Sequence, residues 1–234
     1  KNYINYIILN LPISDVDFQY NVFMSNWSKT VPKAVLHDHL DGGLRVSTLI
    51  ELANQQNYNK LPSTNTQDLL EWIQPKPNKS LALNLEAWEH TIAVMQDTDS
   101  IYRVTIEALE DLSNDGVIYS ELRFAPLVHC QLGLNPTEVV NAVLHGIKDG
   151  ESQFNITAGA ILCAMRHLDN SKEVISLCVE NSDIFAFDLA GPEIGFSALN
   201  HRDALEIAHK NSVNVTLHAD WEVPEGIHEV ILDL

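Results

Sequence analysis

Histidine and aspartate alternate in the segment "VLHDHLDGG", residues 35–43, between apolar residues and a glycine pair. In an extended strand, successive side chains point to opposite faces, so His37, His39 and Asp41 are expected to project from one face. Two neighbouring imidazoles are a ligand pair suited to zinc and similar divalent metals. The segment therefore predicts part of a metal site, for which another part of the chain has to supply a further ligand.

His218 is the candidate for that further ligand, because it lies near the end of another apolar run, "VNVTLHAD", residues 213–220. Three protein ligands with an open fourth position are typical of catalytic zinc rather than structural zinc. Such a metal makes hydroxide available near neutral pH by acidifying a bound water. Hydrolysis is therefore the predicted reaction class. For most of the remaining histidines, which fall on predicted helices and loops, a surface or structural role is expected.

Five apolar runs rich in β-branched residues are the predicted strands: residues 34–42, 117–126, 156–166, 184–191 and 213–220. Most are almost continuously hydrophobic, as strands buried on both faces are. Helical patterns separate them; the clearest has Asn135 as N-cap, Pro136 in the first turn and Glu138 three residues after the cap. Alternating strands and helices predict a parallel α/β sheet, whose active site lies at the carboxyl ends of the strands.

Length, charge and cysteine usage narrow the function classes. A chain of 234 residues is long enough for one large domain. Its net charge of −18 argues against binding nucleic-acid phosphates or anionic membrane surfaces and favours a small neutral or cationic ligand, or a metal. Three cysteines without a C-x-x-C spacing indicate a reducing, cytoplasmic setting.

Five ordered segments resemble the adenosine deaminase family: "PKAVLHDHLDGGLR", "DGVIYSELRFAP", "ILCAMRH", "FDLAG" and "TLHAD". The resemblance extends over about residues 31–234. It implies a zinc-dependent (β/α)₈ barrel that converts adenosine, and also deoxyadenosine, to inosine and ammonia. The implied partner is a small purine nucleoside, with neither nucleic acid nor membrane involved, and the implied cofactor is one Zn²⁺ per chain.

The resemblance also assigns roles to individual residues. Asp41 would bind a ribose hydroxyl, and Gly191 would present its backbone amide to the purine ring, where any side chain would block close approach. Asp188 would support the groups around the metal from behind, with a purely structural buried role as the alternative. The implied zinc ligands are His37, His39 and His218.

The sequence departs from the family pattern at the acid that protonates the purine ring. The family has H-A-G-E at the fifth strand, whereas this chain has "HADWE" at residues 218–222. In strict register Trp221 takes the position of the glutamate. Glu222 is the candidate catalytic acid only if one residue bulges out, because a one-residue slip turns a side chain to the other face.

The resemblance covers about five of the eight β/α units of a barrel, and five strands do not close one. We therefore expect a piece of a longer enzyme, with residues 1–30 as a lead-in and 31–234 as the N-terminal portion of the barrel. The later histidine and aspartate of the family site would lie further along. Two alternatives stay open: a catalytically inactive nucleoside- or zinc-binding relative, and an amidohydrolase acting on adenine or a modified adenosine.

Overall fold

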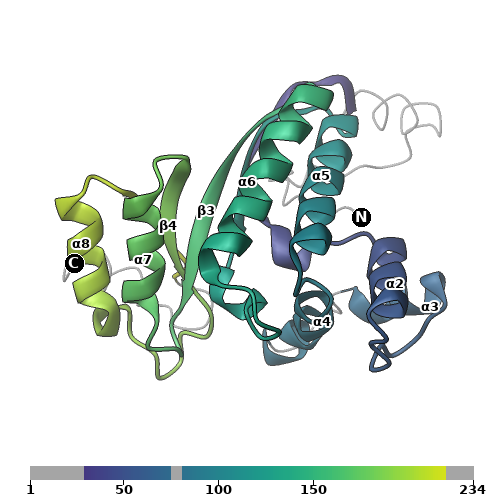
Figure 1. The fold of residues 1–234 in the computed structure, drawn as a ribbon, viewed down its shortest axis with the longest axis horizontal. Helices are drawn as coiled ribbons and strands as arrows, with labels where there is room; N and C mark the ends of the chain where they lie inside the picture. The colour runs from purple at the N-terminus through teal and green to yellow at the C-terminus, as the bar shows by residue number, and fades with distance from the viewer. Residues whose placement is uncertain (1–28, 75–80, 220–234) are drawn as a thin grey trace, which may run out of the picture.

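A five-stranded parallel sheet forms the centre of the molecule in the computed structural model, which describes residues 29–74 and 81–219 (Figure 1). The strands pair in sequential order from β1 to β5. In a barrel, strands that follow one another along the chain are neighbours in the sheet. In a doubly wound sheet, by contrast, the strand order reverses at a switch point. The predicted parallel architecture is confirmed, and all five predicted runs contain strands: β1 Lys33–His39, β2 Val117–Phe124, β3 Thr157–Met165, β4 Ile184–Ala190 and β5 Asn214–Leu217. The predicted lead-in lies outside the described residues, except for its last two.

Helices connect the strands and cover the sheet. Figure 1 shows α5, α6 and α7 packed along the curved sheet, while α2 and α3 lie beside each other at one end of the molecule. The capping box predicted for α6 is present: the Asn135 side chain accepts from the Glu138 backbone amide, and the Glu138 carboxylate accepts from that of Asn135. The α-helices are α2 Val46–Gln55, α3 Thr66–Ile73, α4 Leu81–Ala93, α5 Thr98–Asn114, α6 Pro136–Gln153, α7 Ser171–Glu180 and α8 Arg202–Lys210, and short 3₁₀ helices are η1 Leu40–Gly42, η2 Pro126–His129 and η3 Ala198–His201.

The core lies between the sheet and these helices. Two glycines of α6 let it approach α5 closely: a Cβ on Gly146 would lie 2.6 Å from Thr105 Cβ, and one on Gly150 would lie 2.7 Å from Leu109 Cδ2. Leu109 and the β2 residue Leu122 are fully buried as a result. Burial of such side chains is worth about 1.5–3 kcal/mol each relative to exposure, so this packing fixes the sheet that carries the site.

Strand β1 differs from the predicted extended run in two ways. It ends at His39, and Asp41 lies in η1, so the expectation that Asp41 shares a strand face with the histidines is wrong. The pairing with β2 also shifts register: Val35 pairs with Ser120 and Asp38 with Leu122. Three residues along β1 therefore span the same length as two along β2. The extra residue forms a β-bulge at Leu36 and His37. The backbone at the site is therefore irregular where the sequence pattern suggested a plain strand.

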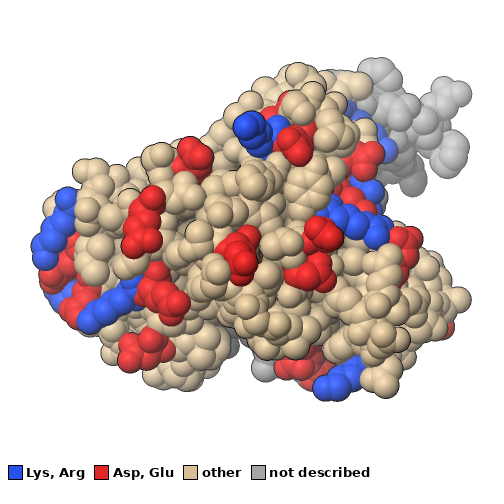
Figure 2. All heavy atoms as spheres, in the orientation of Figure 1, with Lys and Arg blue, Asp and Glu red and all other residues tan. Residues whose placement is uncertain are grey.

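Charged side chains of both signs are interspersed on the face shown in Figure 2. Several basic side chains are paired: Arg45 contacts Glu110 and Asp111, and Lys172 contacts Asp203. No helix in the part of the chain that the structure describes is long and apolar enough to cross a bilayer.

Candidate metal centre

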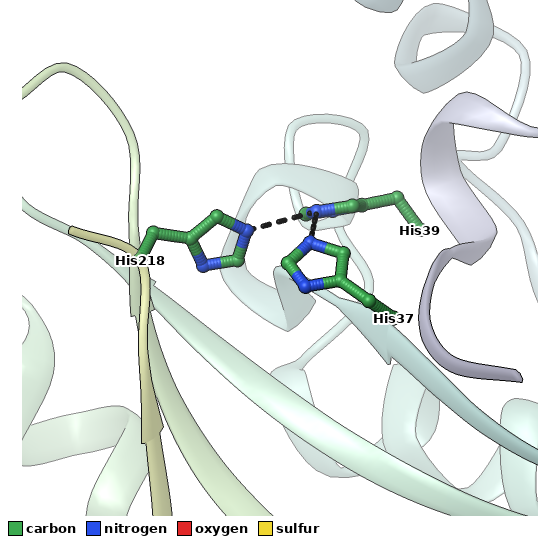
Figure 3. A group of neighbouring side chains, drawn as sticks. All are labelled: His37, His39 and His218. Carbon is green, nitrogen blue, oxygen red and sulfur yellow. Dashed lines mark hydrogen bonds between the residues drawn. The ribbon is translucent and has the colours of Figure 1, made fainter. Parts of the chain in front are cut away.

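Three histidine side chains from the two ends of the sheet converge on one point (Figure 3). Nε2 of His39 lies 3.1 Å from Nε2 of His37 and 3.1 Å from Nε2 of His218. His218 directly follows β5, and its backbone amide donates to the Leu189 carbonyl on β4. Curvature of the sheet thus brings together ligands that are 179 residues apart in the chain.

The geometry of this histidine cluster suits a tetrahedral metal ion. Zinc–nitrogen bonds of about 2.0–2.1 Å place two ligand nitrogens about 3.3 Å apart in a tetrahedron, close to the observed separations. His37 is exposed, whereas His39 and His218 are half-buried, so one side of the cluster stays open. The donor set consists of three imidazoles, which zinc accepts readily.

The surroundings of His37 and His39 favour the neutral form of these two imidazoles. Burial, the Arg123 guanidinium and the neighbouring imidazoles lower the pKa of His37 to about 4. Burial likewise lowers the pKa of His39 to about 4, against the opposing charge of Asp41. A histidine must be deprotonated to bind a metal, so both side chains are in the binding form at neutral pH.

Asp188 lies behind the cluster on β4, fully buried, where its Oδ2 is 2.9 Å from Nδ1 of His218. Its carboxylate accepts hydrogen bonds from Arg123, Cys163 and Thr216. Burial raises the pKa of Asp188, but His218 and Arg123 outweigh it and lower that pKa to about 2. An ionised carboxylate at Nδ1 favours the tautomer that leaves Nε2 free for a metal. Asp188 therefore lies directly behind one of the three histidines, His218.

Asp41 is buried beside the cluster and has one unused acceptor. Its Oδ2 accepts from the backbone amide of Ala125, 3.0 Å away, while its Oδ1 has no hydrogen-bond partner among the described residues. His129 of η2 lies nearby: its Nε2 is 3.8 Å from Asp41 Oδ2, and its Nδ1 is 2.9 Å from the Met95 carbonyl. No sequence pattern singled out His129, because a lone histidine after a strand resembles any structural histidine.

Gly191 directly follows β4 with φ of +95°, a conformation that favours glycine. A Cβ there would lie 3.2 Å from Met165 Cε and 3.3 Å from His167 Nδ1. The absence of a side chain therefore leaves room beside the backbone at the carboxyl ends of β3 and β4.

Sequence reasoning did not single out Trp88, an aromatic residue whose ring lies beside His39. The Trp88 ring on α4 lies 4.9 Å from the His39 ring, centroid to centroid. Gly42 makes room for it, since a Cβ there would be only 2.8 Å from the indole. Glu222, the predicted acid, and Trp221 lie outside the described residues.

Comparison with known proteins identifies the family of this chain. The family model described as "Adenosine deaminase" matches residues 32–234. This chain belongs to the adenosine deaminase family. The adenosine deaminase of Mycolicibacterium gilvum is 42% identical over 213 residues, which cover 87% of this chain and 59% of that protein. The chain thus spans about three fifths of the length of this curated relative.

Two solved structures of purine deaminases share the fold. The Arabidopsis N6-mAMP deaminase matches with a TM-score of 0.74 at 26% identity, covering 88% of this chain and 64% of that one. The adenine deaminase from Arthrobacter aurescens matches with a TM-score of 0.77 at 23% identity, covering 85% and 61%. The sheet of this adenosine deaminase family member is therefore the barrel-type sheet of such enzymes, and the resemblance noted in the sequence is confirmed.

Proposed function

We propose that the protein to which this chain belongs hydrolyses adenosine to inosine and ammonia, and also deoxyadenosine to deoxyinosine and ammonia. The observation that carries the proposal is the convergence of three imidazole Nε2 atoms at the carboxyl ends of β1 and β5, in a member of the adenosine deaminase family. In net terms the exocyclic amino group of the purine leaves as ammonia, and an oxygen atom from water takes its place on the ring carbon.

A single zinc ion is the proposed cofactor, held by His37, His39 and His218. The fit rests on the near-tetrahedral nitrogen separations and on the lowered pKa values of His37 and His39. Zinc bound in such a site supplies Lewis acidity, which makes water a nucleophile near neutral pH. Asp188 holds the His218 ring by its Nδ1 atom, so that Nε2 faces the ion.

The remaining proposed residues bind and protonate the nucleoside. Asp41 accepts a hydrogen bond from a ribose hydroxyl, since its Oδ1 is buried without a partner among the described residues. Gly191 donates its backbone amide to the purine, because the space beside it is free of a side chain. Glu222 is proposed as the acid that protonates the ring nitrogen, on the sequence argument alone.

We also propose a cytoplasmic setting. All three cysteines are free thiols, two of them buried, and none is placed in a disulfide. Free buried thiols suit a reducing compartment, where disulfides do not persist.

The test is a substrate comparison with the full-length protein loaded with zinc. Adenosine is expected to give a higher kcat/KM than free adenine, because only the nucleoside carries the ribose that Asp41 would bind. Equal values for the two would contradict the ribose role. One zinc bound per chain without turnover of either substrate would favour the inactive binding relative instead.

A second candidate function is deamination of N6-methyl-AMP, favoured by the likeness to the Arabidopsis enzyme at 26% identity. Water would then displace methylamine from the purine and leave IMP. The product amine separates the two candidates: adenosine releases ammonia, and N6-methyl-AMP releases methylamine. A kcat/KM for N6-methyl-AMP above that for adenosine would replace the first proposal.

A further inference from the structure

We propose that Arg123 is a positioning residue for the metal centre. Its guanidinium connects the bulge in β1 to the carboxylate of Asp188, which lies beside His218. This inference rests on the proposed function, since it concerns how the zinc ligands are held. Arg123 lies on β2 and is 3% exposed. It touches none of the reacting atoms in this proposal and acts through the strands that carry the ligands.

The first anchor of Arg123 is the bulge itself. The register of β1 against β2 shifts between Val35 and Asp38, so the residues between them leave the regular ladder. A bulge leaves backbone groups without their usual ladder partner. The Leu36 carbonyl, immediately before His37, instead accepts from Nη2 of Arg123 at 2.8 Å. The guanidinium thus supplies a hydrogen bond at the backbone position that aims the His37 ring.

The second anchor is Asp188, two strands further across the sheet from Arg123. Nη1 of Arg123 donates to Asp188 Oδ2 at 3.2 Å, and the same oxygen lies 2.9 Å from Nδ1 of His218. Asp188 has no exposed surface, so its charge requires a buried partner of opposite sign. One guanidinium therefore contacts the backbone that carries His37 and the carboxylate that orients His218.

The chemistry of arginine explains why this position requires arginine rather than lysine. The planar guanidinium holds two donors in a fixed fork, so its two contacts fix the distance between their acceptors. A lysine ammonium at the end of a flexible chain keeps the charge but does not hold both acceptors in one rigid geometry. Replacement of Arg123 by lysine is therefore expected to relax the spacing between His37 and His218 while the buried charge balance is retained.

The experiment measures metal affinity and ligand geometry in the full-length protein. The R123K variant is expected to bind Zn²⁺ at least about 10-fold more weakly in competition with a chelator, as for other residues that orient metal ligands. The visible absorption of the Co²⁺-substituted protein is expected to change as well, because it reports the ligand geometry. Arg45→Lys is the matched control, since Arg45 also bridges carboxylates but lies in the helical layer away from the histidines. It should leave both readouts unchanged.

The outcomes separate this inference from the proposed function. Wild-type zinc affinity and an unchanged Co²⁺ spectrum in folded R123K would overturn the inference alone. A wild-type protein that binds no zinc would overturn both. If R123K does not fold, the doubly neutral R123M/D188N variant replaces it, because it removes both buried charges together. That variant is expected to bind zinc at least about 10-fold more weakly than D188N alone, and equal affinities would overturn the inference.

Discussion

Oδ2 of Asp188 lies 2.9 Å from Nδ1 of His218, while Nε2 on the other side of the same ring faces His39. The two nitrogens of one imidazole are therefore used differently, one toward a buried carboxylate and one toward the proposed metal. This arrangement ties the tautomer of His218 to the charge of Asp188.

Replacement of Asp188 by asparagine should weaken zinc binding about 10- to 100-fold, because the amide has no charge to hold the Nδ1–H tautomer. Chelator competition measures the affinity. Thr216→Val is the matched control: it removes one hydrogen bond to the other carboxylate oxygen and leaves the charge in place. A smaller loss is expected for this control. Unaltered zinc affinity in D188N would show that Asp188 is only structural.

The Asp41→Asn variant should raise KM for adenosine by about 10- to 100-fold, the equivalent of a lost hydrogen bond to a charged acceptor. Activity on free adenine, measured in parallel, should change little. Asp149→Asn is the control, since Asp149 is exposed on α6 and its carboxylate accepts a hydrogen bond from the Tyr102 hydroxyl, far from any proposed site residue in the sequence. An equal loss on nucleoside and free base would place Asp41 outside ribose recognition.

Replacement of Gly191 by alanine should lower the free energy of unfolding by about 1–2 kcal/mol because of the positive φ. It should also reduce activity, since the added methyl group would lie 3.2 Å from Met165 Cε. Gly133→Ala separates the two effects: Gly133 has φ of +110°, but among the described residues no atom beyond its chain neighbours lies within 4 Å of its Cβ position. Urea denaturation and steady-state kinetics provide the two readouts. If G133A and G191A lose activity equally, close approach at Gly191 is not needed.

The metal-free protein should lose stability as the pH falls from about 6.5 to about 4. The pKa of His39 is about 4 in the folded protein against 6.5 for an ordinary histidine. In that window the unfolded chain binds protons that the folded chain does not, so unfolding becomes more favourable at lower pH. Urea denaturation at successive pH values gives the slope. The slope should be shallower in His39→Gln, and a slope identical to wild type would contradict the lowered pKa.

Much of the fold could be predicted from local sequence pattern. All five predicted runs contain strands, and the capping box of α6 forms at the predicted residues. These features depend on contacts within a few residues along the chain, where periodicity and capping chemistry act directly. The ends of the strands were less predictable: β1 stops at His39, because η1 takes Asp41 out of the extended conformation.

The sequence by itself determined which residue types were available for a metal site and that parallel strands would carry them to one edge of the sheet. Only the tertiary structure decided the partners: Arg123 at the bulge, Asp188 at His218, His129 beside Asp41, and Trp88 beside His39. The physical reason is the distance along the chain. These contacts join residues on different strands and helices, so they depend on sheet curvature, strand register and helix packing, which no local pattern specifies.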